Sequence, residues 1–136
     1  MLRYTKSDCD KTPDGIETAT LAQVQFGEGW ELRNNIIFEF EVGYNAKNGA
    51  AFELCNQLMK SIESFEPFKK FAIGIEMFND VGKLDNLNGY ETQDHQFGPV
   101  IKGSFENSLF FEIGYRSGIA EGAIDNVFNI VIGKKF

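Results

Sequence analysis

The sequence predicts an all-β fold, an antiparallel up-and-down meander of about seven or eight long strands. In seven consecutive segments, apolar or uncharged residues occupy every second position and charged residues fall between them. This period of two is the pattern of strands with two unlike faces. One of these faces is almost free of charged side chains in all seven segments. The tightest connections fall at one end of the predicted sheet and the longest loop falls at the other, as in a meander.

Each segment has apolar or uncharged residues at every second position, and the segments cover residues 16–26, 32–42, 50–58, 71–77, 97–105, 109–117 and 124–136. In the first segment, the charge-poor face begins at Ile16 and ends at Phe26. The segment 50–58 also fits a helical period, but the alternation favours a strand there too. Lys134 is the single charged residue on these faces, whereas the opposite faces carry both acidic and basic residues.

Glycine, asparagine and aspartate mark the connections between the segments. A tight hairpin turn is expected at Gly27-Glu28-Gly29, and a two-residue turn is expected at Glu106-Asn107. Both turns fall at the same rim of the sheet when the strands are followed in chain order. The longest connection, residues 79–94, falls at the opposite rim. Connections of intermediate length are expected at residues 44–49, 62–66 and 118–122.

Length and composition narrow the class of protein. The chain has 136 residues, the size of one domain, with a partial strand and a loop expected over 1–15 and the seven-strand meander over 16–136. A hydrophobic content of 43% excludes a disordered tail. The net charge of −7 argues against nucleic acid as a partner, because nucleic-acid binding needs a basic surface. No apolar run approaches the roughly 20 residues of a transmembrane helix.

The N-terminal ten residues contain neither an apolar core nor a small-residue cleavage site, so this chain shows no signal peptide. Taken alone, that observation points to the cytosol. In the other interpretation the chain is truncated at its N-terminus, so that residues 1–6 end an earlier strand and residues 7–15 form a loop. Cys9 and Cys55 could form one disulfide, but two cysteines define no framework and we expect them to be unpaired.

Alternation does not decide whether water or lipid faces the charge-poor side. Three features favour a transmembrane β-barrel. The segments run about ten residues, longer than typical soluble strands and long enough for a tilted span. The polar face mixes both signs of charge with small residues such as Gly74, Gly98, Ser104 and Gly114, which a lumen tolerates. The chain stops on Phe136 in an alternating strand, which looks like the terminal assembly signal of outer-membrane proteins.

Several stretches of the sequence carry a resemblance to a known family. They are Gly-Ile-Glu-Met-Phe at 74–78, His-Gln-Phe-Gly-Pro-Val at 95–100, Glu-Ile-Gly-Tyr-Arg-Ser-Gly-Ile at 112–119 and the terminal strand to Phe136. The stretch Phe-Gly-Glu-Gly-Trp-Glu-Leu at 26–32 fits the same family. Over roughly 16–136, the sequence resembles Gram-negative outer-membrane β-barrels described as porin-like or transporter-like. These motifs are structural, and none implies a catalytic residue. Members of the family carry a signal peptide and further strands ahead of this region. The resemblance therefore implies the C-terminal portion of a larger barrel, located in the cell outer membrane.

Charged residues on the polar face are the best functional candidates. Five of them are expected to point into one lumen: Glu53, Glu76, Lys102, Glu112 and Arg116. They would line a polar path that selects solutes, or they would plug the interior by pairing with one another. Aromatic residues of the charge-poor face are expected to form girdles at the lipid interfaces and, at the chain end, the assembly signal: Phe26, Trp30, Phe71, Phe105, Tyr115 and Phe136.

The sequence contains no arrangement that predicts catalysis. His95 is the single histidine and has no cysteine near it in the sequence, so we expect a structural side chain rather than a metal ligand. No Gly-x-Ser-x-Gly motif is present. We therefore predict a non-enzymatic, porin-like outer-membrane barrel or passive pore without metal or cofactor, whose partners are outer-membrane lipid and the barrel-assembly machinery. The alternative is a soluble up-and-down barrel that binds a small apolar ligand in its interior.

Overall fold

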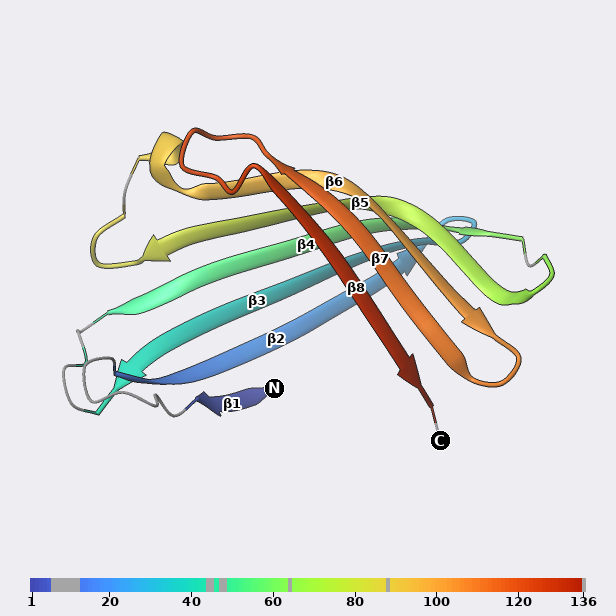
Figure 1. The fold of residues 1–136 in the computed structure, drawn as a ribbon, viewed down its shortest axis with the longest axis horizontal. Helices are drawn as coiled ribbons and strands as arrows, with labels where there is room; N and C mark the ends of the chain where they lie inside the picture. Colours follow the sequence, from blue (N-terminus) through green and yellow to red (C-terminus); the bar gives the residue numbers. More distant parts are fainter. Residues whose placement is uncertain (6–12, 44–45, 47–48, 64, 88, 136) are drawn as a thin grey trace.

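The computed structural model describes residues 1–5, 13–43, 46, 49–63, 65–87 and 89–135. They form one curled antiparallel sheet of eight strands in up-and-down order, which confirms the all-β meander (Figure 1). The strands are β1 (Leu2–Thr5), β2 (Asp14–Phe26), β3 (Trp30–Val42), β4 (Ala50–Ile62), β5 (Phe68–Lys83), β6 (Asp94–Phe105), β7 (Leu109–Gly118) and β8 (Asn126–Lys134). A short 3₁₀ helix, η1 (Tyr90–Thr92), lies between β5 and β6.

The seven expected segments coincide with β2 to β8, and the segment with a helical period, 50–58, is part of strand β4. Several boundaries differ from expectation. Strand β4 ends at Ile62 rather than at residue 58, and β5 and β6 begin at Phe68 and Asp94 rather than at residues 71 and 97. Strand β5 continues to Lys83, well past residue 77, because the chain pairs with β4 and β6 beyond the last apolar residue of the alternating pattern. Strand β8 begins at Asn126 rather than at residue 124. Pairing with neighbouring strands, which the local pattern does not encode, sets these ends.

The connections have the expected asymmetry. Residues 27–29, 63–67 and 106–108 join strands at one end of the sheet, called here the short-loop rim. At the other end, the long-loop rim, the connections include residues 84–93 and 119–125. The tight turn between β2 and β3 needs glycine because Gly27 has a φ of 52° and Gly29 has a φ of 75°, both in the left-handed region. Local turn chemistry therefore fixes the register of this hairpin.

The register places the charge-poor residues of all strands on one face of the sheet. Directly paired residues project to the same side, and apolar residues oppose one another across neighbouring strands. Examples are Ile36 with Leu54, Ile73 with Ile101, and Ile113 with Ile130. The polar residues consequently share the other face, as the alternation predicts.

The sheet curls into a half-barrel (Figure 1). Its polar face is the concave side, where Gln57, Glu76 and Gln96 are buried. Curvature is tightest at β5 to β7, where β5 and β7 contact each other across β6. Glycines permit close contacts between strands in this part of the sheet. A Cβ atom on Gly74 would collide with the carbonyl oxygen of Leu58, and one on Gly98 would collide with that of Tyr115. In the described part of the chain, β1 and β8 each pair with a single neighbour, so the sheet has two edges.

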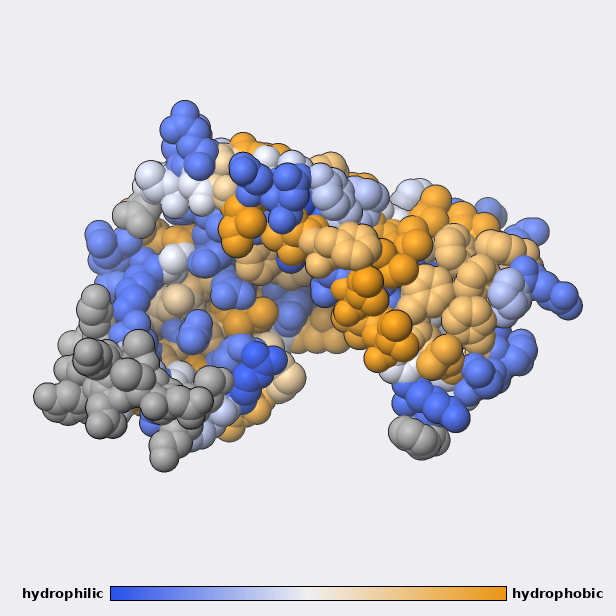
Figure 2. All heavy atoms as spheres, in the orientation of Figure 1, coloured by the Kyte–Doolittle hydropathy of each residue, from blue (hydrophilic) through white to orange (hydrophobic). Residues whose placement is uncertain are grey.

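Burial differs sharply between the two faces. Among the described residues, the buried hydrophobic side chains are Met59 and Val100, and both lie on the concave face together with buried Gln57, Glu76 and Gln96. The convex face instead exposes large apolar side chains on every long strand, including Val24, Phe40, Ile73, Ile75, Phe97, Tyr115, Phe128, Ile130 and Ile132. Figure 2 shows hydrophobic residues gathered over β7 and β8 beside a hollow that contains hydrophilic ones. The usual distribution of a water-soluble fold is thus inverted.

Candidate lumen lining on the concave face

Four of the five candidate lumen residues meet in one network on β4 to β7. Arg116 Nη1 lies 3.2 Å from Glu76 Oε1, and Lys102 Nζ lies 2.9 Å from Glu112 Oε2. Gln57 joins the two ion pairs. Its Nε2 donates to Glu76 and, at 2.8 Å, to Glu112 Oε1, while its Oε1 accepts from Lys102 Nζ at 2.5 Å. We call these five residues the concave network.

The network is charge-balanced and largely removed from solvent. The Glu76 side chain is 5% exposed and the Arg116 side chain is 14% exposed. Besides its ion pair, the Arg116 guanidinium lies 4.8 Å from the centroid of the Phe78 ring, a distance at which cation–π attraction operates. Charges buried to this extent are costly unless they are paired. Glu76 has both an ion pair and a hydrogen bond from Gln57, whereas Nε of Arg116 is buried without a hydrogen-bond partner among the described residues.

Gly98 makes the ion pair between Glu76 and Arg116 possible. These two residues are on β5 and β7, and Gly98 is the β6 residue paired with Glu76 in the sheet. It lies against the backbone of Tyr115 and Arg116. Because Gly98 has no side chain, the carboxylate and the guanidinium meet directly across the intervening strand.

Polar side chains continue the lining toward β2. In the register, Gln57 pairs with Arg33, and Arg33 pairs with Gln23. Arg33 Nε lies 2.5 Å from Glu31 Oε1, and Gln23 Nε2 donates to Glu31 Oε2 at 2.7 Å. The concave face therefore presents hydrogen-bonding side chains on six consecutive strands, from β2 to β7.

Glu53, the fifth candidate, lies on the same face but outside the concave network. It pairs in the register with Asp80, and its other charged neighbours are Glu17 and Glu39. All of them lie toward the long-loop rim. The lining is therefore neutral in sum at the concave network and acidic near Glu53.

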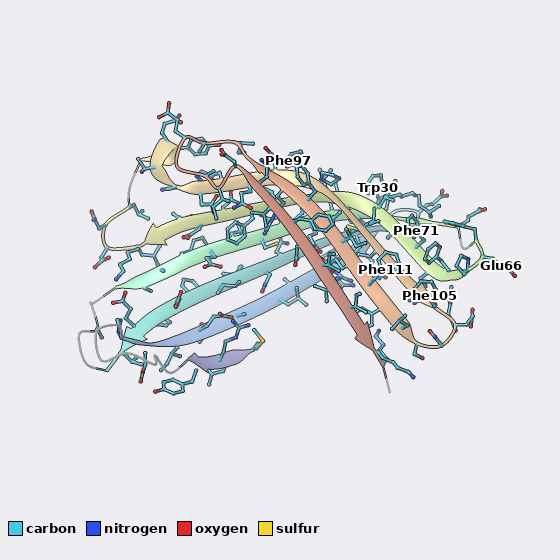
Figure 3. The ribbon with its side chains drawn as sticks, in the orientation of Figure 1. Trp30, Glu66, Phe71, Phe97, Phe105 and Phe111 are labelled. Carbon is cyan, nitrogen blue, oxygen red and sulfur yellow. The ribbon has the colours of Figure 1, made fainter. Side chains whose placement is uncertain are left out.

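Two of the residues expected in an aromatic girdle lie in an aromatic cluster at the short-loop rim. Phe71 and Phe105 belong to a cluster on the convex face that also contains Phe65, Phe68 and Phe111, with contacting ring centroids 5.1 to 5.9 Å apart. Figure 3 shows Phe71, Phe105 and Phe111 together at this end of the sheet, with Phe97 set apart from them. Edge-to-face and tilted ring contacts of this kind stabilise the rim.

The other expected girdle residues divide between the two rims. Phe26 and Trp30 are paired across the hairpin at the short-loop rim, and Lys60 Nζ lies 5.4 Å from the centroid of the Trp30 ring. Tyr115 lies near the opposite, long-loop end and pairs with Phe128. Phe136, expected as the assembly signal, lies outside the described residues.

Aromatic residues on the convex face thus occur in two bands, and between them lie aliphatic residues together with Asn34 and Asn56, which pair with each other. On β3, Trp30 is near one rim and Phe40 is near the other. The ten-residue step between them corresponds to about 33 Å along a strand, or about 25 Å along a barrel axis at a tilt of about 40°. That spacing matches the roughly 25 Å apolar band of outer-membrane barrels.

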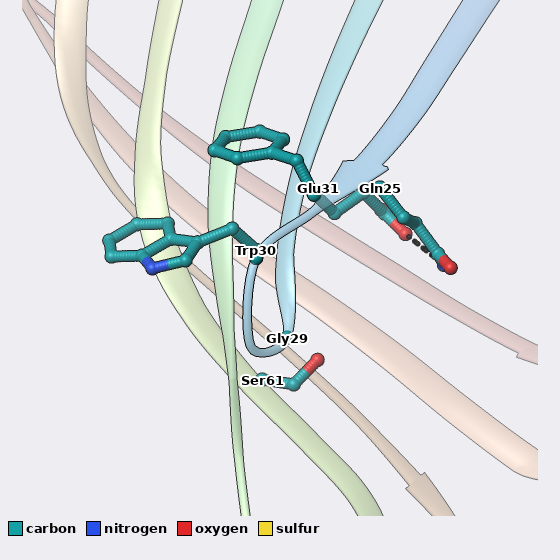
Figure 4. A pocket seen from close by; sticks show the side chains of 7 residues that line it. Gln25, Gly29, Trp30, Glu31 and Ser61 are labelled. Carbon is teal, nitrogen blue, oxygen red and sulfur yellow. Dashed lines mark hydrogen bonds between the residues drawn. The ribbon is translucent and has the colours of Figure 1, made fainter.

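A pocket of about 370 Å³ lies at the short-loop rim (Figure 4). It surrounds the hairpin turn between β2 and β3 and is lined by Gln25, Phe26, Gly27, Gly29, Trp30, Glu31 and Ser61. Its polar groups already bond to one another, since Gln25 Nε2 donates to Glu31 Oε2 at 3.3 Å.

His95 has protein partners on both ring nitrogens. Nδ1 lies 2.9 Å from Oδ1 of Asn79, and Nε2 lies 2.9 Å from Oε1 of Gln93. Within the described residues, no three His, Cys, Asp or Glu side chains are grouped so that they could hold a metal ion. Cys9 lies outside the described residues, so the expectation that Cys9 and Cys55 are unpaired stays a prediction.

Gln57 is the member of the network that the sequence did not single out. It is uncharged, and an isolated glutamine on a polar strand face carries no functional signal. The register of β4 against β5, which places Gln57 opposite Glu76, is the information that identifies it. No local pattern in the sequence specifies that register.

The described part of the chain contains no helix with the length and apolarity needed to cross a bilayer. Comparisons with protein-family models, with curated proteins and with solved structures found no match to this chain.

Proposed function

We propose that the chain forms part of the wall of an outer-membrane β-barrel, with its convex face against lipid and its concave face along a passive aqueous path. The observation that carries this proposal is the inverted distribution of residues. Large apolar side chains are exposed on the convex side of every long strand, whereas buried Gln57, Glu76 and Gln96 lie on the concave side. In water, an apolar surface of this extent would favour association or aggregation. In a bilayer, the same surface is satisfied by lipid.

The concave face supports a path for small polar solutes. Its ion pairs and amides would be hydrated by water in a lumen, and the acidic and basic groups near mid-depth are fixed by mutual contacts. The same groups disfavour the alternative of a soluble barrel with an apolar ligand inside, because such a ligand would leave charged groups desolvated. We propose that outer-membrane lipid and the barrel-assembly machinery are the partners of the chain. We assign it no catalytic role.

The free edges of the sheet have a consequence for this proposal. In hydrocarbon, an unpaired backbone N–H or C=O group costs several kcal/mol. In the bilayer, the outer edge of β8 and residues 20–26 of β2 therefore have to pair with further strands.

Insertion into vesicles tests the assignment of the two faces. The chain is folded from urea into phosphatidylcholine vesicles, and the membrane-bound, protease-resistant fraction is measured for the wild type, Phe111→Arg and Glu112→Gln. The substituted residues are adjacent on β7 but lie on opposite faces. We expect Phe111→Arg to block insertion and Glu112→Gln to insert like the wild type. Equal yields for the two variants would contradict the assignment.

Solute uptake tests the path separately. Vesicles that contain the inserted chain are diluted into an isotonic solution of a small sugar, and swelling is followed by light scattering. We expect swelling that a large dextran does not produce. Normal insertion without swelling would leave the lipid-facing assignment standing and exclude an open pore.

A further inference from the structure

A row of carboxylates crosses five consecutive strands on the concave face, from β6 to β2 (Figure 1). Asp94 pairs in the register with Asp80, and Asp80 pairs with Glu53. On β3 and β2 the row continues with Glu39, which pairs with Glu17 two residues nearer the long-loop rim. We call these five residues the acidic half-ring. Neighbouring strands lie about 4.8 Å apart, so the half-ring follows the wall for roughly 19 Å.

Little basic charge balances the half-ring. Arg3 Nη1 lies 3.2 Å from Glu17 Oε2, and no described Lys or Arg forms an ion pair with the other four members. The remaining acidic side chains of the described concave face each form an ion pair with a Lys or Arg, and they are Glu31, Glu41, Glu76 and Glu112. Negative charge therefore accumulates at the half-ring rather than along the whole lining.

An unsatisfied acceptor at the β6 end of the half-ring independently points to a cation. Gln96 is 1% exposed, and its Nε2 donates to Asp94 Oδ1 at 2.9 Å and to Oδ2 at 2.7 Å. The carboxylate fixes the orientation of this amide, because a flipped amide would place two acceptors against each other. Oε1 of Gln96 is buried without a hydrogen-bond partner among the described residues. Such an acceptor is unfavourable unless a cation or a water molecule satisfies it.

The half-ring is suited to mobile cations rather than to a chelated metal ion. Within the described residues, no three His, Cys, Asp or Glu side chains are grouped so that they could hold a metal. Carboxylates spaced around a wall instead make the electrostatic potential of the adjacent lumen negative, because a low-dielectric wall focuses their field. Rings of Asp and Glu select cations in channels in this way.

We propose that the acidic half-ring makes the aqueous path selective for small inorganic cations over anions. The inference rests on the proposed path along the concave face. A solute that enters from the long-loop rim meets the half-ring before the concave network, since Asp80 lies nearer that rim than Glu76 on β5. The concave network is charge-balanced, so the half-ring is the part of the described wall that discriminates between the two signs of charge.

The reactivity of an introduced cysteine measures the potential at the half-ring without a pore. Ile37 faces Glu53 in the register, so Ile37→Cys is combined with Cys9→Ser and Cys55→Ser. In detergent micelles, the rate of modification by a cationic methanethiosulfonate reagent is divided by the rate for an anionic one. The same ratio at Asn129→Cys, on the concave face of β8, is the reference. We expect the ratio at Ile37→Cys to be at least about fivefold higher, since a potential of about one kT changes it about sevenfold.

Neutral variants test whether the half-ring causes this preference. Glu39→Gln, Glu53→Gln and Asp80→Asn together should bring the ratio at Ile37→Cys to within about twofold of the reference. The double variant Glu39→Gln with Glu53→Gln, which should lower the ratio in the same direction, is used if the triple variant does not fold. The matched control should leave the ratio unchanged, because it removes the same charge at the short-loop rim, with Glu28→Gln, Glu66→Gln and Glu106→Gln.

Selectivity itself is measured in planar bilayers. In a KCl gradient, the reversal potential should have the sign of a preference for K⁺ over Cl⁻. It should move toward zero in the neutral triple variant and not in the matched control. Raising KCl to about 1 M should also weaken the preference of the cysteine for the cationic reagent, because the Debye length falls to about 3 Å.

Two results would overturn the inference. They are equal reagent ratios at Ile37→Cys and Asn129→Cys, and a current whose reversal potential shows no preference for K⁺. Absence of any current would refute the pore on which the inference rests, whereas the reagent ratio would still decide whether the half-ring attracts cations. Failure of the pore and failure of the half-ring are therefore distinguishable.

Discussion

Replacement of Ile75 by arginine distinguishes lipid from water at the convex face. Ile75 is on β5, lies between the two aromatic bands and is 44% exposed. In water, a substitution at such an exposed site away from a special feature changes stability by about 0.5 kcal/mol or less. At the midplane of a bilayer, an arginine on the lipid face costs about 2–4 kcal/mol. The two environments therefore predict effects that differ several-fold.

The expected effect in a bilayer is large enough to measure by equilibrium folding. A cost of 2–4 kcal/mol lowers the ratio of folded to unfolded protein about 30- to 700-fold. The assay is urea titration of folding into phosphatidylcholine vesicles, followed by the fluorescence of Trp30, the single tryptophan. The matched control is Asn35→Arg, which adds the same side chain to the concave face of β3, two strands away. We expect it to cost less than about 1 kcal/mol, because an aqueous lumen hydrates the charge.

Two results would refute this reasoning. If Ile75→Arg unfolds within about 0.5 kcal/mol of the wild type, the convex face is not in lipid. If Asn35→Arg costs as much as Ile75→Arg, arginine is harmful on both faces and the inverted-barrel assignment fails. Ile75→Leu provides the remaining reference, since it keeps the apolar character and changes only the shape of the side chain.

Three other substitutions test the packing of the sheet by the same unfolding assay. Gly98→Ala should destabilise by roughly 3 kcal/mol or more, because its Cβ would collide with the β7 backbone, whereas Gly89→Ala meets nothing within 4 Å and should be near neutral. Arg116→Met should cost about 3–5 kcal/mol by leaving Glu76 unpaired, and most of that loss should return in the double variant with Glu76→Leu. No recovery would mean that the pair is not coupled. Lys69→Ala should change stability by less than about 1 kcal/mol, since both members of its ion pair are exposed, and a larger loss would contradict the described geometry.

The fold could be predicted because its signal is local. Alternation with a period of two specifies both the strand and its two faces within a few residues of sequence, and Gly27-Glu28-Gly29 specifies the tight turn between β2 and β3. The end of β5 at Lys83 was missed because pairing with neighbours extends the strand past its apolar pattern. Local patterns therefore predict which segments are strands better than where these strands stop.

The candidate site was only partly predictable because it depends on register. The period-two alternation places Glu76, Lys102, Glu112 and Arg116 on one face of the sheet. The sequence does not predict which of these residues are in contact. That these four residues meet, and that Glu53 does not join them, follows from how far each strand is shifted against its neighbours. Gln57 could not be predicted as part of the network either, because only the strand register places it opposite Glu76.

Curvature links the shape of the sheet to the chemistry of its concave face. Gly98 lets β7 approach β5 across β6, and the same missing side chain leaves the gap through which Glu76 and Arg116 form their ion pair. We expect a larger residue at this position to have two effects together, flattening the sheet and separating Glu76 from Arg116. Two otherwise independent properties, the local radius of the barrel wall and the neutralisation of a buried charge, thus depend on one residue. Gly98→Ala in the background of Glu76→Leu and Arg116→Met isolates the first of them. The destabilisation that persists there is due to curvature alone, and the difference from the single variant measures how strongly the wall and the ion pair are coupled.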